Sequence, residues 1–255
     1  MNPIIIIPAR MASTRLPGKP LANLAGKPMI VRVLERGLEA DVGPVIVACD
    51  DLRVAEVVRD AGGKVCMTDS QLPSGSDRVY AALSSVDPEE RYNIVINLQG
   101  DSPTTESALI RASLKGLKET DFDISTIAIK KENLEEIHNP SICKIALAGS
   151  ENETVRRALY FSRSVIPAGG NVFYYHIGLY AYRRFALKKF VENPPSGLEI
   201  IERLEQLRAL EMGLSIGVTL VNSVPQEVNT PEDLRVVGAY FESHSDVRQK
   251  TFSAL

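Results

Sequence analysis

A run of four consecutive isoleucines, Ile4 to Ile7, lies close to the N-terminus and constrains the fold more than any other feature of the sequence. β-Branched residues favour extended backbone, and a short apolar run without polar alternation is typical of a strand buried on both faces. Such strands belong to parallel sheets covered by helices on both sides. The run therefore predicts an α/β protein with this segment inside its sheet.

The first half of the chain alternates short apolar strand patterns with helical patterns. The predicted strands cover 44–49, 64–68 and 93–98, and the predicted helices cover 28–40, 50–61 and 74–86. A strand–helix–strand rhythm of this kind predicts a mainly parallel, doubly wound sheet with right-handed crossovers.

The second half of the chain is less regular. Strands are expected at 122–129, 142–147, 172–182 and 216–221, and helices at 103–117, at 198–212 and from about 231 onward. No repeat or linker divides the sequence. We therefore expect a single domain over 1–255, with a smaller antiparallel subregion inserted around 130–215.

Composition argues against several classes of protein. The formal net charge of −3 is unlike the basic excess of a nucleic-acid-binding surface. The three cysteines, Cys49, Cys66 and Cys143, form no CxxC pair, which favours buried thiols over a zinc site or a disulfide framework. No segment approaches the ~20 apolar residues of a membrane span, and the apolar run after Met1 is too short for a signal peptide. We expect a cytoplasmic protein with no nucleic-acid or membrane partner.

The loop after the isoleucine run contains the first candidate site. Arg10, Arg15 and Lys19 lie within ten residues of one another, among turn-forming residues that include Gly18. Ligands of open α/β sheets bind beyond the carboxyl ends of the strands. Three cations together with backbone amides near Ser13 suit an oligophosphate, although the loop has neither the Walker nor the dinucleotide fingerprint. A simple surface turn would leave the three cations without a role.

The strand at 93–98 ends at Gln99, Gly100 and Asp101. Gly100 permits a tight turn and the close approach of a ligand. Asp101 is expected at the carboxyl end of the strand, where Mg²⁺ is commonly held by one or two carboxylates and substrate phosphates. Capping of the helix predicted at 103–117 explains Asp101 equally well.

Three further segments have structural explanations of their own. The turn 74–78 can cap the helix that follows it, and its main chain could also contact a base edge. His176 stands alone in an aromatic strand, without a nucleophile motif nearby, which is typical of a core or surface histidine. Glu199, Glu202 and Glu205 have the spacing of a solvated helix face.

Taken in order, these motifs resemble those of the 3-deoxy-manno-octulosonate (Kdo) cytidylyltransferases, also called CMP-Kdo synthetases. The matching segments are 7–10, 13–21, 26–30, 65–68, 74–78, 97–101, 158–163, 176–180, 204–208 and 229–234. The resemblance spans nearly the whole chain. It implies a nucleotide-diphospho-sugar transferase (glycosyltransferase-A-like) fold, a homodimer, dependence on Mg²⁺, and sugar binding and dimerisation by the subregion around 130–215.

The resemblance also implies a reaction, in which CTP and Kdo give CMP-Kdo and pyrophosphate for lipopolysaccharide biosynthesis. A sugar hydroxyl attacks the α-phosphorus in line, so the protein positions the substrates and neutralises charge without a covalent nucleophile. The implied catalytic residues are Arg10, Lys19 and Asp101, and the implied Mg²⁺ ligands are Asp101 and Asn229. The implied substrate-binding residues are Pro8, Ala9, Ser13, Arg15, Ser74, Gly75, Arg78 and Gln99 toward the nucleotide and Arg163, His176, Glu205 and Gln206 toward the acid sugar.

Two positions depart from the pattern of that family. Ser102 stands where the family usually has glutamate, and Asn229 stands where the family has the aspartate that is its second metal carboxylate. An amide oxygen can bind Mg²⁺ but carries no charge, so weaker metal binding is expected. Glu227 shares a face with Asn229 in an extended segment, and it or a water molecule is expected to compensate.

Other functions stay open on the sequence alone. A cytidylyltransferase for another acid sugar, such as 8-amino-Kdo or a sialic-acid-like sugar, would carry the same nucleotide motifs. A non-catalytic nucleotide-sugar binder would result if Asn229 abolished turnover, although retention of Lys19, Asp101, His176 and Gln206 argues against it. The aromatic strand 172–182 is a candidate dimer interface.

Overall fold

The computed structural model describes residues 1–13, 15–132 and 136–252 of the chain. The strands are β1 (Pro3–Ala9), β2 (Asn23–Leu24), β3 (Lys27–Pro28), β4 (Val45–Cys49), β5 (Lys64–Met67), β6 (Ile94–Asn97), β7 (Ile124–Lys131), β8 (Lys144–Leu147), β9 (Val155–Ser162), β10 (Phe173–Arg183) and β11 (Ile216–Val221). The α-helices are α1 (Met29–Glu39), α2 (Leu52–Asp60), α3 (Gly75–Val86), α4 (Ser107–Glu119), α5 (Arg184–Val191), α6 (Gly197–Glu202), α7 (Gln206–Glu211) and α8 (Pro231–Phe252).

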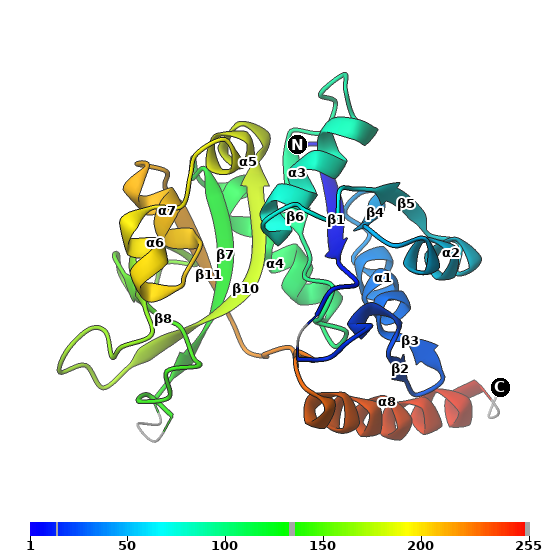
Figure 1. Cartoon of the computed structure of the whole chain (residues 1–255). Helices are drawn as coiled ribbons and strands as arrows, with labels where there is room; N and C mark the ends of the chain where they lie inside the picture. The colour runs from blue at the N-terminus through cyan, green and yellow to red at the C-terminus, as the bar shows by residue number, and fades with distance from the viewer. Residues whose placement is uncertain (14, 133–135, 253–255) are drawn as a thin grey trace.

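One mixed sheet of nine strands runs through the molecule in the order β5-β4-β1-β6-β10-β7-β11-β9-β8 (Figure 1). Its first half is parallel, as expected, with β1 between β4 and β6. The four isoleucines of β1 are at most 1 % exposed. Ile4 and Ile6 belong to a core cluster with residues of α3 and α5, and Ile5 and Ile7 to one with residues of α1, α2 and α4. The fully apolar run thus reflects helices on both faces of the sheet.

The antiparallel part of the fold is larger than expected and continues the same sheet. β10 pairs antiparallel with both β6 and β7, and β9 pairs antiparallel with β8 and β11. Neither β9 nor α5 was expected from the sequence. Because β10 lies inside the sheet and most of its side chains are buried, its position gives no support to a dimer interface on this strand. The single domain with an insertion around 130–215 stays a prediction.

The prediction of one continuous helix at 198–212 is wrong, because the structure has two helices there, α6 and α7. Arg203 ends α6 in the left-handed conformation, with a φ of 57°. A non-glycine residue in this region interrupts a helix, and the chain changes direction here. The break lies just before Glu205 and Gln206, two of the predicted sugar-binding residues.

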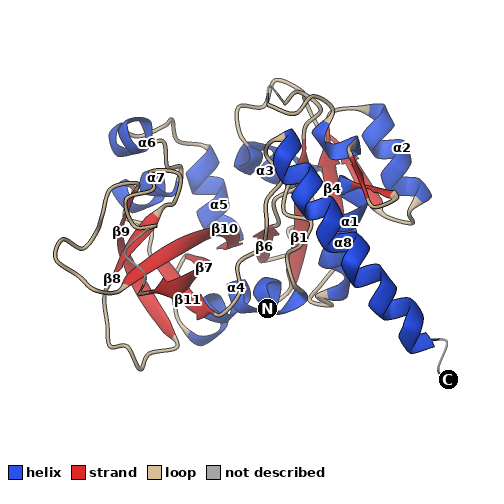
Figure 2. Cartoon of the chain, turned by 90° about the horizontal axis from the view of Figure 1, so that it is seen from below, coloured by secondary structure: helices blue, strands red, loops and turns tan. Residues whose placement is uncertain are grey.

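The final helix α8 begins at Pro231, as expected, and crosses the parallel half of the molecule (Figure 2). Val237 of this helix belongs to a small apolar cluster with Leu24 and Met29, near the N-terminal loop. The segment before α8 is thereby held near the carboxyl end of β1. Within the part of the chain that the structure describes, no helix is long and apolar enough to cross a membrane.

Candidate active site

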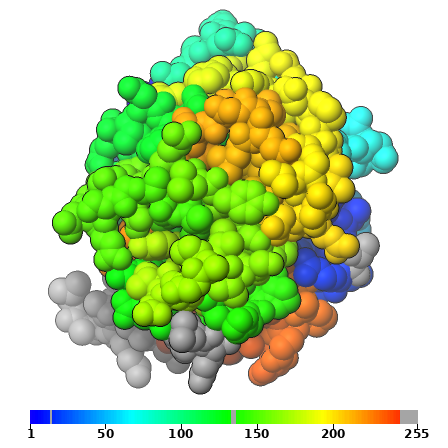
Figure 3. Space-filling model, turned by 90° about the vertical axis from the view of Figure 1, so that its left-hand side faces the viewer, coloured from blue at the N-terminus to red at the C-terminus, as the bar shows by residue number. Residues whose placement is uncertain are grey.

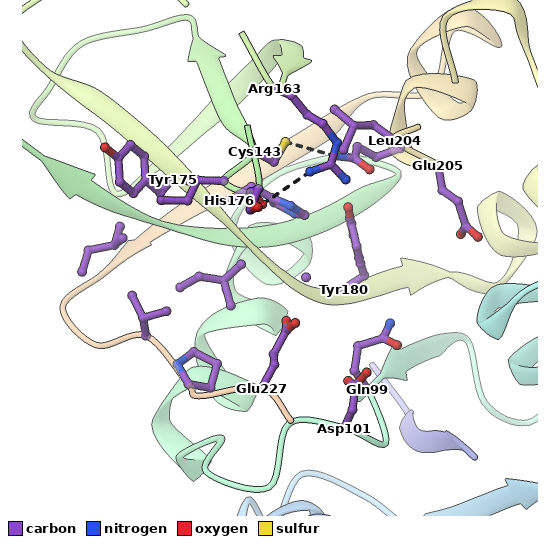
Figure 4. Close-up of a pocket in the computed structure, with 18 of the residues that line it drawn as sticks. Gln99, Asp101, Cys143, Arg163, Tyr175, His176, Tyr180, Leu204, Glu205 and Glu227 are labelled. Atoms are coloured by element: carbon purple, nitrogen blue, oxygen red, sulfur yellow. Dashed lines mark hydrogen bonds between the residues drawn. The ribbon is translucent and has the colours of Figure 1, made fainter. Parts of the chain in front are cut away.

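Two adjoining cavities open at the carboxyl ends of β1 and β6. The smaller one, of about 350 Å³, lies between the N-terminal loop, the start of α3 and the turn after β6. The larger one, of about 850 Å³, lies between β10, the α6–α7 break and the segment around Glu227 (Figure 4). Gly75, Gln99, Asp101 and Glu205 line both cavities. A ligand in one cavity can therefore contact a ligand in the other.

Every predicted site residue lines one of these cavities. The smaller cavity takes Pro8, Ala9, Arg10, Ser13, Arg15, Lys19, Ser74, Gly75, Arg78, Gln99, Asp101, Glu205 and Asn229. The larger one takes Arg163, His176 and Gln206, together with the residues common to both. The predicted nucleotide and sugar sets thus lie in two adjoining cavities and meet at Gly75, Gln99 and Glu205, which line both.

Lys19 lines the smaller cavity. Its Nζ donates to Asp101 Oδ2 at 2.8 Å and to Asn229 Oδ1 at 3.1 Å. Arg15 Nη2 also donates to Asn229 Oδ1, at 3.1 Å. A main-chain hydrogen bond of 2.8 Å from Val228 N to the Asp101 carbonyl aligns the two segments. Because Glu106 holds the N-cap position of α4, the alternative in which Asp101 caps that helix is wrong.

Glu227 extends this cluster toward the larger cavity, as Figure 4 shows. Asn229 Nδ2 donates to Glu227 Oε2 at 3.2 Å, so the Asn229 amide turns its oxygen to the two cations and its nitrogen to the glutamate. Glu227 is exposed at the mouth of the cleft, yet desolvation of its carboxyl by nearby protein atoms raises the pKa of that carboxyl, and the negative charge of Asp101 adds to the effect.

The wall of the smaller cavity rests on a buried ion pair that the sequence analysis missed. Arg78 Nη2 donates to Asp50 Oδ2 at 3.0 Å, with both side chains at most 5 % exposed. Asp50 Oδ1 also accepts a hydrogen bond of 2.9 Å from Met11 N, in the N-terminal loop. The signal in the sequence is the Asp50-Asp51 pair after β4. Asp51 caps α2, which leaves Asp50 free to bind Arg78.

Arg163 reaches into the larger cavity from the end of β9. Its Nε donates to the Glu202 carbonyl at 3.3 Å and its Nη1 to the Pro140 carbonyl at 3.0 Å. The carboxylate of Glu202 accepts from Arg163 N and from Ser162 Oγ. The guanidinium is thus held by main-chain oxygens, without a carboxylate partner among the described residues, and retains its charge for an anionic ligand.

The three glutamates around α6 each have a specific partner, so the expectation of a solvated helix face is wrong. Glu199 forms a buried pair with Arg208, with N–O distances of 2.6 and 2.7 Å. Glu202 holds the segment at Arg163, as described above. Glu205 Oε2 accepts from Ser76 Oγ at 3.0 Å, and although the residue is exposed at the cleft, desolvation of its carboxyl by the surrounding atoms raises the pKa of that carboxyl. The break at Arg203 is what turns Glu205 toward the cavities.

His176 lies in the wall of the larger cavity. Its ring is 5.3 Å from the ring of Phe161, edge-on, and 5.2 Å from that of Tyr180. Burial lowers the pKa of His176 to about 3, so its imidazole is neutral near pH 7. The expectation of an ordinary core or surface histidine is incomplete, because the ring also borders the cavity, where the family resemblance places it.

Gln206 and Cys143 lie together in the same cavity. Gln206 Nε2 donates to Cys143 Sγ at 3.6 Å. Burial raises the pKa of the Cys143 thiol to about 12, which keeps it protonated and unsuited to nucleophilic chemistry. All three cysteines are free and buried, as expected from the sequence.

The comparisons with known proteins point to one family. The family model described as cytidylyltransferase matches residues 4–216. A 3-deoxy-manno-octulosonate cytidylyltransferase of Parvibaculum lavamentivorans is 52 % identical over 91 % of this chain and 90 % of its own length. One of Rhodospirillum centenum is 47 % identical over 97 % and 96 %, respectively.

A solved structure of similar fold is described as CMP:2-keto-3-deoxy-manno-octonic acid synthetase complexed with CTP. It matches with a TM-score of 0.87 and 36 % identity, over 96 % of this chain and 100 % of the other. This likeness confirms the expected nucleotide-diphospho-sugar transferase fold. The sheet, the smaller cavity with its three cations, and the family match together define a nucleotidyltransferase. The chain belongs to the cytidylyltransferase family. Within it, the chain falls among the 3-deoxy-manno-octulosonate cytidylyltransferases.

Proposed function

We propose that this protein transfers CMP from CTP to Kdo and releases pyrophosphate, as a step in lipopolysaccharide biosynthesis. The observation that carries the proposal is the pair of connected cavities. One has the cations that a triphosphate needs, the other has an arginine without a carboxylate partner among the described residues, and Asp101 borders both. The similarity to curated Kdo cytidylyltransferases supports the same activity.

In this proposal the N-terminal loop binds the triphosphate. Arg10, Arg15 and Lys19 neutralise the phosphate oxygens, and Ser13 adds a hydroxyl donor. Lys19 contacts Asp101, which borders both cavities, and its charge offsets the negative charge that develops as pyrophosphate leaves. The cytidine lies toward Ser74, Gly75, Arg78 and Gln99, and Ser74 caps α3 as expected, by accepting from Asp77 N at 3.2 Å.

The acid sugar occupies the larger cavity in this proposal. Arg163 pairs with its carboxylate, while Glu205, Gln206 and the neutral His176 contact its hydroxyl groups. The sugar hydroxyl then faces the α-phosphorus across Asp101. Holding the two substrates in line is the main contribution of the protein, because no covalent intermediate is needed.

The donor set of the smaller cavity fits Mg²⁺. In the structure the Lys19 ammonium lies against both the Asp101 carboxylate and the Asn229 amide oxygen, so these oxygens point at one cationic position. Among the described residues no three His, Cys, Asp or Glu side chains form a metal-binding cluster, so the triphosphate has to supply further ligands, as Mg²⁺ sites commonly require. Asp101 and Asn229 would hold the ion, with Glu227 adjacent. When bound, Mg²⁺ supplies charge neutralisation and lowers the pKa of the sugar hydroxyl.

Asn229→Asp is expected to lower the Mg²⁺ concentration for half-maximal activity on the order of tenfold, and Glu227→Gln to raise it. The reason is that each substitution changes the negative charge beside the position that Lys19 now contacts by one unit. Mg²⁺ titration of pyrophosphate release, together with direct Mn²⁺ binding in the presence of CTP, measures the effect. Asn152→Asp, on an exposed turn, adds the same charge elsewhere and is the control. Identical metal dependence in all four proteins would remove Glu227 and Asn229 from the metal site.

We propose that the protein forms a homodimer through the face that carries α6. Ile200 and Ile201 of α6 are 65 % and 78 % exposed, and Leu159 of β9 is 56 % exposed. The end of the molecule with α6, α7 and β8 is turned to the viewer in Figure 3. Large apolar side chains that stay exposed at one end of the molecule are a candidate interaction surface. Because Glu202 of the same helix holds Arg163, contact between two copies would stabilise the sugar cavity.

Ile201→Glu is expected to convert the dimer into a monomer, because a charge would be buried in an apolar interface. Light scattering after gel filtration measures the mass. Leu52→Glu is the matched control, since Leu52 is also well exposed, at 65 %, but lies on α2 in the other half of the molecule. A wild-type protein that is monomeric at high concentration would contradict the proposal.

The proposed activity is tested by measuring pyrophosphate released from CTP and Mg²⁺ with a panel of acid sugars. Rapid release with Kdo is the expected result. Preference for 8-amino-Kdo or a sialic acid would instead identify a cytidylyltransferase for another sugar. Calorimetric binding of CTP without pyrophosphate release from any sugar would identify a non-catalytic binder.

A further inference from the structure

A β-bulge lies in the wall of the larger cavity. β10 pairs with β7 through Ile177 opposite Ile127 and then through Tyr180 opposite Thr126, so Gly178 and Leu179 have no counterpart on β7. Bulges interrupt the ladder of main-chain hydrogen bonds and are frequent beside active sites, where they change the direction of a side chain. The hydroxyl of Thr126, which is fully buried, lies 2.9 Å from the Leu179 carbonyl and 3.2 Å from the Ile177 carbonyl.

The same hydroxyl lies 3.0 Å from His176 Nε2. It has a single proton to donate, and a carbonyl oxygen can only accept. If the proton went to His176, the Thr126 oxygen would face the Leu179 carbonyl at 2.9 Å with no hydrogen between two electronegative atoms. The Thr126 hydroxyl therefore donates its proton to the Leu179 carbonyl, and its oxygen accepts a hydrogen bond from His176 Nε2. This arrangement requires a proton on Nε2 of the imidazole.

We propose that Thr126 is a positioning residue that holds His176 as the Nε2–H tautomer, so that Nδ1 presents an unprotonated acceptor to a hydroxyl group of the sugar. The ring cannot easily turn, because Phe161 and Tyr180 pack against it. Within the described part of the chain, Nδ1 has no hydrogen-bond partner, while the His176 side chain borders the larger cavity. In Figure 4 the ring lies beside Arg163 and Cys143.

The assignment deepens the proposed function and rests on it for the identity of the ligand. An imidazole that offers only a lone pair repels a carboxylate and attracts a hydroxyl. His176 consequently selects a hydroxyl group of the acid sugar, and the carboxylate of the sugar is left to Arg163. The tautomer itself is a property of the free protein and does not depend on which sugar binds.

Two-bond ¹H–¹⁵N NMR of the imidazole nitrogens tests the tautomer directly. The chain has three histidines, and His176→Gln assigns the resonance by its disappearance. In the wild-type protein we expect a protonated Nε2 and a bare Nδ1, unchanged between pH 5 and pH 8. A protonated Nδ1, or an imidazolium ion in that range, would overturn the proposal.

Three threonine variants separate positioning from packing. Thr126→Val removes the hydroxyl at nearly constant volume and is expected to give a mixture of tautomers and a KM for Kdo raised on the order of tenfold, with the KM for CTP unchanged. Thr126→Ser retains the hydroxyl and is expected to restore both the spectrum and the KM. Thr219→Val is the matched control, because Thr219 is buried on the adjacent strand β11 and its hydroxyl has no hydrogen-bond partner among the described residues.

A wild-type tautomer and a wild-type KM in Thr126→Val would refute the positioning role. If Thr126→Val does not fold, the wild-type spectrum and the Thr126→Ser variant still decide the matter, since a serine with an altered tautomer would equally refute it. Failure of the proposed function can be told apart from failure of the tautomer assignment. In the first case the wild-type protein would release no pyrophosphate with any acid sugar, while the NMR spectrum would still report the tautomer of His176.

Discussion

Asp101→Asn is expected to lower kcat/KM for pyrophosphate release by about 10²–10³-fold, which is the loss typical when one preorganised electrostatic group is removed from a site where charge develops. The substitution keeps the shape of the side chain and removes its charge. Lys19 would lose its carboxylate partner at 2.8 Å, and the donor set for Mg²⁺ would lose the charge of that carboxylate. The main-chain bond between Val228 and the Asp101 carbonyl does not depend on the carboxylate, so the fold should persist.

The assay is steady-state pyrophosphate release at saturating Mg²⁺, with circular dichroism to verify folding. Asp121→Asn is the matched control, because Asp121 is exposed and lies outside both cavities. It should retain wild-type turnover. Normal turnover in Asp101→Asn would mean that Asp101 has no part in the reaction.

Arg78→Met is expected to destabilise the protein by about 3–5 kcal/mol, because it leaves the Asp50 carboxylate buried without its ion-pair partner. It should also weaken CTP binding. Asp50 accepts from Met11 N, so a displaced Asp50 loosens the loop that carries Arg10, Arg15 and Lys19. Urea unfolding measures the loss of stability, and calorimetry with CTP measures the loss of affinity.

Arg53→Met provides the control for that experiment, because Arg53 pairs with the neighbouring Asp51 at the protein surface. Pairs of exposed charges contribute little to stability, since water and salt screen them. We expect no measurable change in unfolding or in CTP affinity for this variant. Equal behaviour of Arg53→Met and Arg78→Met would show that burial of the Arg78–Asp50 pair has no energetic consequence.

The parallel half of the fold was predictable because each buried strand there is a short, unbroken apolar run. The strand β9 was not, since its pattern includes Arg156, a charged residue that is buried and donates to the Tyr174 hydroxyl at 2.6 Å. The division of the predicted helix at 198–212 was also invisible, because nothing in the local sequence marks Arg203 for the left-handed conformation. Tertiary partners override local pattern at both places.

The residues expected at the site were found through motifs, and the residues missed are those that act through another side chain. Asp50 binds Met11 at a separation of 39 residues in the sequence, and Thr126 contacts His176 at a separation of 50. Because both pairs are far apart in the sequence, no local spacing identifies the partners, although the Asp50-Asp51 pair marks Asp50 itself. Asp101 is an intermediate case, because its position after β6 was evident and only the structure excluded the helix cap.

The contact between Lys19 and Asn229 joins the start of the chain to its last quarter, across a separation of 210 residues. During synthesis on the ribosome, the strands β1, β4 and β6 emerge long before the segment around Asn229, which completes the candidate active site. A nascent chain can therefore build most of its sheet while its phosphate-binding loop still lacks a finished pocket. The site could capture a nucleotide only after β11 and the segment around Asn229 have left the ribosome.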